Sequence, residues 1–117
     1  DLDLGQTSLT ELNLTGCTDI RRFTLSSSSL PATDRANLLA AIQTWNRLWG
    51  LTLADCSLTA SEVDAILAHL DRDCPTPPPG ADWFRIDLGG ASNAGPSATG
   101  AASVASLRAK GWVVTVR

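Results

Sequence analysis

The chain has 117 residues, 44% of them hydrophobic and 18% charged, which is the composition of one globular domain and excludes a disordered chain. The net charge of −3 at pH 7 gives no reason to expect nucleic acid or anionic lipid as a partner, and no apolar run reaches the ~18 residues of a membrane span. Met is absent, even at position 1, so we expect residues 1–117 to be a single domain from the C-terminal part of a longer chain.

A leucine-rich pattern, L-x-x-L-x-L followed by a small or polar turn residue, recurs along the chain and predicts short strands. In chain order, the strands of one parallel front sheet are expected at about 2–4, 23–25, 51–53, 84–88 and 112–116, with a back strand at 12–14. Equivalent positions in successive front strands are separated by 21, 28, 35 and 28 residues. The 35-residue interval has seven residues more than its neighbours, and a proline-rich segment at 74–80, which cannot form helix or central strand, accounts for them.

Three helices are expected between the strands, at about 32–45, 60–70 and 98–109. The first two carry apolar residues at helical spacing, and the stripe of the first helix includes Trp45. Thr59 and Glu62 form a capping-box pattern at the start of the second helix, and Gly111 is placed to end the third. A 28-residue unit therefore holds a strand, a turn and a helix, and its leucine row must pack on the neighbouring units.

These strand cores, turns and periods resemble the leucine-rich-repeat superfamily over nearly the whole chain. The run at 9–18 is similar to the 21-residue internalin-type repeats of bacterial surface proteins, and the segment at 93–116 is similar to a tail of leucine-rich segments in bacterial surface and phage structural proteins. The resemblance implies an α/β fold, a short right-handed solenoid, and brings no shared catalytic residues. The asparagine ladder usual in the family is replaced by turn residues that offer fewer hydrogen bonds to the backbone, namely Thr7, Ser28, Cys56 and Ala91.

The front sheet is the usual binding surface of such solenoids, and its outward side chains are the first candidate site. Expected there are Asp3, Thr24, Thr52, Asp87 and Thr115, flanked by Arg22, Gly50 and Arg85. The row is mostly small and polar and has no large anchor, whereas binding hot spots favour Trp, Tyr and Arg. The alternative is a solvated sheet surface with no partner.

A second candidate site is a column two residues before each strand core, formed by Arg21, Trp49, Phe84 and Trp112. At the ~4.8 Å spacing of neighbouring strands the rings can pack edge to face, and Arg21 can cap the column through a cation–π contact. One interpretation is an aromatic strip that binds a carbohydrate or a protein partner. The other is a structural ladder that shields the loops.

The remaining chemistry-bearing residues form no catalytic or metal-binding pattern. Cys17 and Cys56 are expected to be buried free thiols, and Cys74 is expected to be an exposed thiol or one that pairs outside this chain. His69 is expected at the surface or at a helix end, and the segment 71–73 at a solvated helix end rather than in a cation site. No catalytic residue, metal ion or cofactor is therefore expected.

Together these features favour a non-enzymatic binding, display or adhesion module of a larger secreted, cell-surface or virion protein, with an extracellular location. Its partner would be a protein or a carbohydrate, without nucleic-acid binding or membrane insertion. The alternative is a structural domain that decorates or cements a virion or filament through copies of itself. The first strand has no capping unit before it, so we expect the N-terminal side of the solenoid to continue into, or dock on, other structure.

Overall fold

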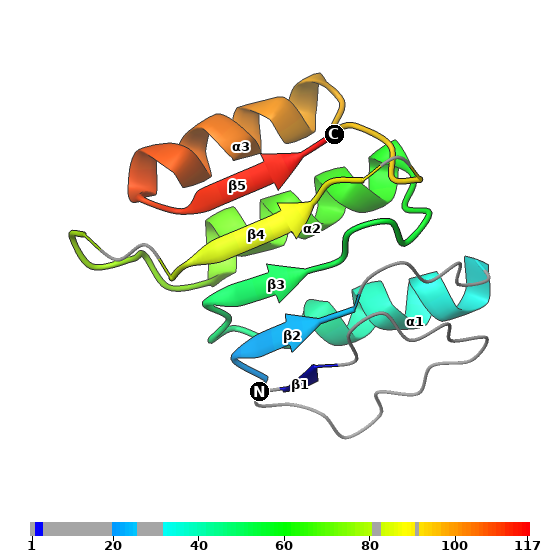
Figure 1. Cartoon of the computed structure of the whole chain (residues 1–117), viewed down its shortest axis with the longest axis horizontal. Helices are drawn as coiled ribbons and strands as arrows, with labels where there is room; N and C mark the ends of the chain where they lie inside the picture. The colour runs from blue at the N-terminus through cyan, green and yellow to red at the C-terminus, as the bar shows by residue number, and fades with distance from the viewer. Residues whose placement is uncertain (1, 4–19, 26–31, 81–82, 91) are drawn as a thin grey trace.

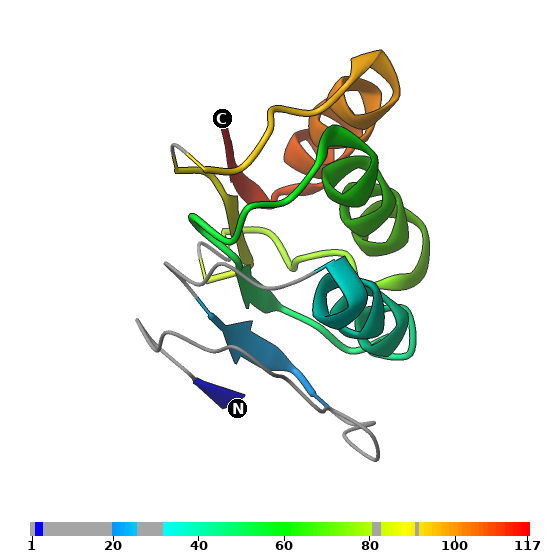
Figure 2. The ribbon, with the colours of Figure 1, turned by 90° about the vertical axis from the view of Figure 1, so that its right-hand side faces the viewer.

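The computed structural model describes residues 2–3, 20–25, 32–80, 83–90 and 92–117, and the side chains of those from residue 20 onward. These residues form two layers, a parallel sheet and helices that all cover the same face of it (Figures 1 and 2). The α/β class expected from the sequence is confirmed. In the described part of the chain, no helix covers the other face of the sheet (Figure 2).

The strands pair in chain order, and all pairs are parallel. They are β2 (Arg22–Thr24), β3 (Gly50–Thr52), β4 (Arg85–Leu88) and β5 (Val113–Val116), and a two-residue segment, β1 (Leu2–Asp3), lies beside β2. The pairing predicted from the intervals of 28, 35 and 28 residues is confirmed by the alignment of Phe23, Leu51, Ile86 and Val114. The seven additional residues before β4 therefore do not shift its register. The bounds of β2 to β5 differ from the expected ones by one residue, and the back strand predicted at 12–14 lies outside the described residues.

The three helices lie where the sequence predicts them: α1 (Ala32–Ile42), α2 (Ala60–Asp73) and α3 (Ala98–Lys110). The prediction for α1 is wrong at its end, because the chain leaves the helix in a tight turn in which Trp45 N donates to Ile42 O. Trp45 enters the core from this turn rather than from the helix. α2 is three residues longer than predicted, and it ends before Cys74, whose ψ of 160° is the extended conformation that a following proline favours.

Side chains alternate along the strands, and the inward set packs against the helices to form the core. Leu51 and Leu53 belong to it with at most 1% exposure, which confirms the core positions predicted from the repeat. Phe23 and Trp45 pack with a ring-centroid distance of 5.2 Å and so join β2 to the turn after α1. The sheet and the helices therefore share one core.

The start of α2 and the end of α3 are capped by the residues that the sequence predicts. Thr59 Oγ1 accepts from Glu62 N and the Glu62 carboxylate accepts from Thr59 N, which confirms the capping box. The same carboxylate pairs with the Arg35 guanidinium of α1 at 3.0 Å, so one side chain caps α2 and ties it to α1. Gly111 ends α3 in the left-handed conformation, with φ of 106°.

α3 is rich in alanine, yet it is firmly attached to α2. It buries Val104 and Leu107. At its start, Asp64 of α2 accepts hydrogen bonds from the backbone N–H and from the hydroxyl of Ser97. A Cβ added to Gly100 would collide with the Asp64 carboxylate, so this glycine allows the two helices to approach.

Asn93 provides the kind of buried hydrogen bonding that the sequence predicted to be missing from the turns. It is fully buried, and its Oδ1 accepts from Cys56 N at 2.9 Å and from Leu58 N at 3.0 Å. Its Nδ2 donates, at 2.7, 3.0 and 2.9 Å, to the carbonyl oxygens of Leu53, Leu88 and Gly89. The turns after β3 and β4 therefore do have an asparagine as hydrogen-bond partner, but it lies two residues beyond the predicted turn position and serves both turns.

Of the four turn positions predicted to lack asparagine, only Cys56 is among the described residues; Thr7, Ser28 and Ala91 lie outside them, as does Cys17. Cys56 is a fully buried free thiol, as predicted. Its Sγ lies 3.4 Å from the carbonyl oxygens of Leu25 and Ala54, so the thiol has a polar partner on either side.

Candidate functional site

The uncovered face of the sheet, called the front face below, carries the first set of predicted site residues in two rows. Strand register places Arg22, Gly50, Arg85 and Val113 in one row and Thr24, Thr52, Asp87 and Thr115 in the next. Asp3 pairs with Thr24 in register, but its side chain lies outside the described residues. The structure thus brings these residues onto one face, and their binding to a partner stays a prediction.

A hollow opens on the front face where Gly50 stands without a side chain between two arginines. Its volume is about 240 Å³, and it is lined by Arg22, Trp49, Gly50, Leu51, Thr52, Trp83 and Arg85. Adjacent strands lie ~4.8 Å apart, so the two arginine backbones are about 10 Å apart across the glycine. A Cβ on Gly50 would come within 3.1 Å of Arg22 Cγ, so any side chain at this position narrows the space. We call it the Gly50 hollow.

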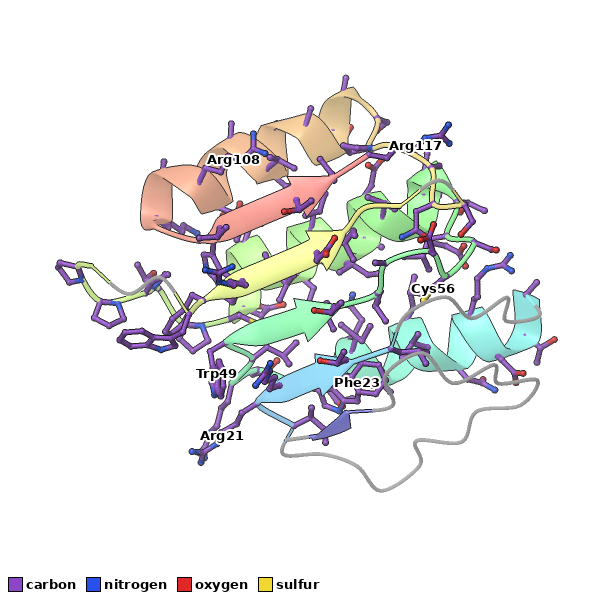
Figure 3. The ribbon with its side chains drawn as sticks, viewed as in Figure 1. Arg21, Phe23, Trp49, Cys56, Arg108 and Arg117 are labelled. Atoms are coloured by element: carbon purple, nitrogen blue, oxygen red, sulfur yellow. The ribbon has the colours of Figure 1, made fainter. Side chains whose placement is uncertain are left out.

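Two tryptophans border the Gly50 hollow near the amino-terminal ends of the strands. Trp49 is half-buried just before β3 (Figure 3). The Arg22 guanidinium lies over it, 5.8 Å from the ring centroid. Trp83 is 54% exposed, and its ring centroid lies 6.2 Å from that of Phe84. An indole this exposed beside two guanidiniums combines the side chains that dominate binding hot spots.

Sequence reasoning missed Trp83, which is not among the candidate residues of either predicted site. The signal that could have found it is its position shortly after the proline-rich segment 74–80, whereas α1 and α3 lead into β3 and β5 without such an insertion. A residue that enters a strand from an inserted loop is not held in the helix–sheet core, and so it can stand at the surface.

The edge-to-face packing predicted for the aromatic column is confirmed for Phe84 and Trp112, whose ring centroids lie 5.2 Å apart. Both rings are buried, with 8% and 3% exposure, which agrees with the structural ladder and not with a continuous strip open to a partner. Because strand side chains alternate, a residue two positions before an inward core residue shares its inward face. The predicted cation–π cap is also wrong in its residue, since Arg22 rather than Arg21 contacts Trp49, while Arg21 is exposed at the start of β2 (Figure 3).

The prediction of a surface position for His69 is also wrong, because its side chain is fully buried. It lies next to the apolar stripe of α2 and fills the space below the turn after α1. Nδ1 is 3.2 Å from Asp73 Oδ2, and Nε2 is 3.1 Å from Trp45 O. A polar ring can be buried here because both of its nitrogens have partners.

Cys74 completes a group that resembles a nucleophile, base and orienting acid, with Sγ 3.8 Å from His69 Nε2. Cys74 Sγ also donates to Trp45 O at 3.5 Å, the carbonyl oxygen that His69 Nε2 contacts, so the thiol has a carbonyl acceptor beside the imidazole. Burial raises the pKa of the Cys74 thiol to about 11, further raised by Asp73 and opposed by a backbone hydrogen bond from Leu48. The group therefore lacks an activated nucleophile, and Cys74 is half-buried rather than exposed as predicted.

The segment 71–73 is only partly the solvated helix end that the sequence predicts. Asp71 accepts hydrogen bonds from Lys110 Nζ and Ser106 Oγ of α3, both at 2.7 Å. Burial alone would raise the pKa of Asp71, but these two hydrogen bonds and the charge of Lys110 outweigh it and hold the pKa below its usual value. Asp73 is exposed, and its pKa is lowered chiefly by a hydrogen bond from Arg72. Asp71 thus links α2 to α3 instead of facing solvent.

Within the described ranges, no three His, Cys, Asp or Glu side chains gather where they could hold a metal ion, and no helix is long and apolar enough to cross a membrane. The Gly50 hollow and its arginine and tryptophan border are therefore the strongest candidate site on these residues. Comparison with protein-family models, with curated proteins and with solved structures gives no match to this chain.

Proposed function

We propose that the chain is a short right-handed leucine-rich-repeat solenoid that acts as a non-catalytic binding or display module of a larger secreted, cell-surface or virion protein. Its partner contacts the front face at the Gly50 hollow. The observation that carries the proposal is the exposed Trp83 beside Arg22 and Arg85, on a sheet face that no described helix covers. Large aromatic and arginine side chains gathered in a hollow are typical of binding surfaces.

The solenoid is supported by the repetition of the elements. Each helix leads into the next strand of the sheet, and elements of one kind contact their neighbours in sequence, α1 with α2 and α2 with α3. The 28-residue offset recurs between aligned strand positions on both sides of the proline-rich segment. Stacking of units on nearest neighbours is the defining property of a solenoid, and on this proposal β1 is the first of five front strands.

A role without catalysis is supported by the state of the one group that resembles a catalytic set. The Cys74 thiol stays protonated at neutral pH because burial raises its pKa to about 11. The thiol also donates to Trp45 O, while its Sγ lies 3.8 Å from His69 Nε2, the nitrogen that would have to act as the base. Moreover, these side chains lie on the helical side of the molecule, away from the Gly50 hollow.

The proposal is tested by probing the labelled chain on an array of glycans and extracellular-matrix proteins, with Trp83→Ala as the site variant. Val113→Ala is the matched control, because Val113 is 41% exposed on the same face but does not line the Gly50 hollow. We expect binding to at least one ligand class, lost in Trp83→Ala and retained in the control, with unchanged thermal melts. Binding that is equally strong in both variants would exclude the hollow as the site.

A decorating or cementing role is the second candidate, and one observation favours it. At the sheet edge, exposed Val113 lies beside an apolar hollow formed with Gly111 and the prolines Pro77, Pro78 and Pro79. Edge strands are natural contact sites for further copies of a chain. Size-exclusion chromatography with light scattering separates the two roles: a monomer that binds the array supports the first, and assembly that Val113→Lys abolishes supports the second.

A further inference from the structure

We infer that the Gly50 hollow binds a carboxylated sugar ring, one hexuronate unit of an acidic polysaccharide. This inference rests on the proposed binding function and adds the chemistry of the ligand. It places the carboxylate of the sugar between Arg22 and Arg85 and the apolar face of the ring against Trp83. The hollow itself follows from Gly50, which leaves the strand between the arginines without a side chain.

The first step is the charge of the site. The chain as a whole is acidic, with a net charge of −3, yet the residues that line the Gly50 hollow include two arginines and no carboxylate. A third arginine, Arg21, is exposed next to Arg22. The planar guanidinium fork matches a carboxylate with paired hydrogen bonds, so the local charge selects an anion of that shape.

The second step is the exposed ring. Trp83 keeps 54% of its surface in solvent, and Trp49 is half-buried at the same border. The aliphatic part of Arg22 lies against Gly50, and its guanidinium lies over Trp49, 5.8 Å from the ring centroid, so charge and ring meet at the border of the hollow. A ligand that offers both a flat apolar face and a carboxylate uses the indole and the guanidiniums together, and a uronate ring has these two features.

The third step is size. At about 240 Å³ the hollow is smaller than the ~300–1,000 Å³ of sites for drug-sized ligands, which suits one ring of a chain that continues outside. The polysaccharide can continue over Thr24 and Thr52 of the second row, whose hydroxyls can hydrogen-bond with sugar hydroxyls, and this course keeps it on the β2 side of Asp87 in the same row. A protein partner would need to cover about 800 Å² of this face, and the second row gives it no large anchor.

The experiment is a titration of the chain with trigalacturonate, followed by tryptophan fluorescence and calorimetry. Its methyl ester is the matched ligand, because it keeps the rings and removes the charge. A pentaglutamate peptide carries carboxylates without sugar rings. We expect trigalacturonate to bind at least about tenfold more tightly than its ester and than the peptide, and its affinity to fall with added salt.

Three variants locate the binding. Arg22→Gln is expected to weaken it about tenfold or more, through loss of charge-assisted hydrogen bonds, and Trp83→Ala by roughly three- to tenfold. Gly50→Val fills the hollow and should abolish binding. The added side chain must displace part of Arg22, so the folding of Gly50→Val is checked by circular dichroism. If Gly50→Val does not fold, Trp83→Ala is the test of the hollow, because Trp83 is exposed. Arg72→Gln, an exposed arginine on α2, is the charge-matched control.

Equal binding of the acid and the ester, or tighter binding of the peptide, would overturn the uronate inference. The same holds if Arg72→Gln weakens binding as much as Arg22→Gln, since the effect would then be one of net charge. These results would not refute the proposed binding function, provided that some ligand on the array binds the chain and loses that binding in Trp83→Ala. The binding function itself fails if no array ligand loses its binding in Trp83→Ala.

Discussion

Replacement of Asn93 by alanine should cost more stability than any surface change in the chain. The side chain is fully buried and makes five hydrogen bonds to the backbone of the turns after β3 and β4. Alanine removes all five and leaves a cavity where the amide was. The N–H groups of Cys56 and Leu58 lose the acceptor described above, and water cannot reach them without opening the turn.

The expected loss of stability follows from the two N–H groups that lose their acceptor. A buried donor without a partner costs roughly 1–3 kcal/mol, so two such donors cost about 3–5 kcal/mol after partial relaxation. Gly89 O keeps one partner, because Asp55 N donates to it at 3.0 Å, so we do not count it among the losses. A domain of this length is stable by on the order of 10 kcal/mol, so the variant should lose a third to a half of that.

The assay is urea denaturation followed by circular dichroism, with free energies of unfolding compared at an unchanged slope. Ser92→Ala is the control in the same turn, because Ser92 Oγ accepts a single exposed hydrogen bond from Ser57 N at 3.2 Å. We expect it to change stability by less than about 0.5 kcal/mol. A loss below about 1 kcal/mol for Asn93→Ala would refute the reasoning that this amide fastens both turns.

Three further predictions concern the helical layer. Gly100→Ala should lower the thermal midpoint and the stability by about 1–2 kcal/mol, because the added methyl group meets the Asp64 carboxylate of α2. This loss outweighs the helix preference of alanine over glycine, which is up to ~1 kcal/mol. A higher midpoint would contradict the close approach of α2 and α3 at this glycine. In a Cys17→Ser background, the rate of Cys74 alkylation in the folded chain should reach half of its maximum near the pKa of about 11 set by burial, and a half-maximal rate near the ordinary pKa of 9.0 would show an unperturbed thiol. The lowered pKa of Asp71 adds stability above its ordinary value of 3.8, which is lost as the pH falls through its folded pKa. Lys110→Met should therefore reduce the difference between urea midpoints at pH 7 and pH 3, and an unchanged difference would count against the Asp71 link.

The strands and their register could be predicted from the sequence because the signal is local and repeated. The offset from Phe23 to Leu51 equals that from Ile86 to Val114, so one pattern predicts both pairings. The capping box at Thr59 and the stop at Gly111 could be predicted for the same reason, since each depends on residues within one turn of a helix. The length of α1 was less predictable, because a turn after Ile42 brings Trp45 into the core just as a longer helix would.

The side chains that were misplaced depend on contacts between distant segments. His69 is buried because Trp45 O and Asp73 meet its two ring nitrogens, and no helical pattern predicts a carbonyl 24 residues away. Asn93 bonds to turns formed up to 40 residues earlier in the chain, so its role is invisible in its own segment. Phe84 could have been placed correctly, because strand alternation puts it on the same face as Ile86.

The candidate site was predicted in its parts but not as a hollow. Arg22, Gly50 and Arg85 were placed correctly in one row of the front face. The space between them arises only when three strands align, and its border depends on Trp83, which enters from the inserted segment. A single sequence gives the members of such a row but not the volume that they enclose.

The insertion before β4 also has a consequence for how such a module can diversify. Its seven additional residues leave the register of β4 on β3 unchanged. The length and sequence of this segment can therefore vary without changing how the two strands pair. The same segment delivers Trp83 to the border of the hollow. On the proposed function, exchange of the loop at 75–83 is thus a route to altered ligand specificity on a constant scaffold, in the manner of a variable loop on an antibody framework.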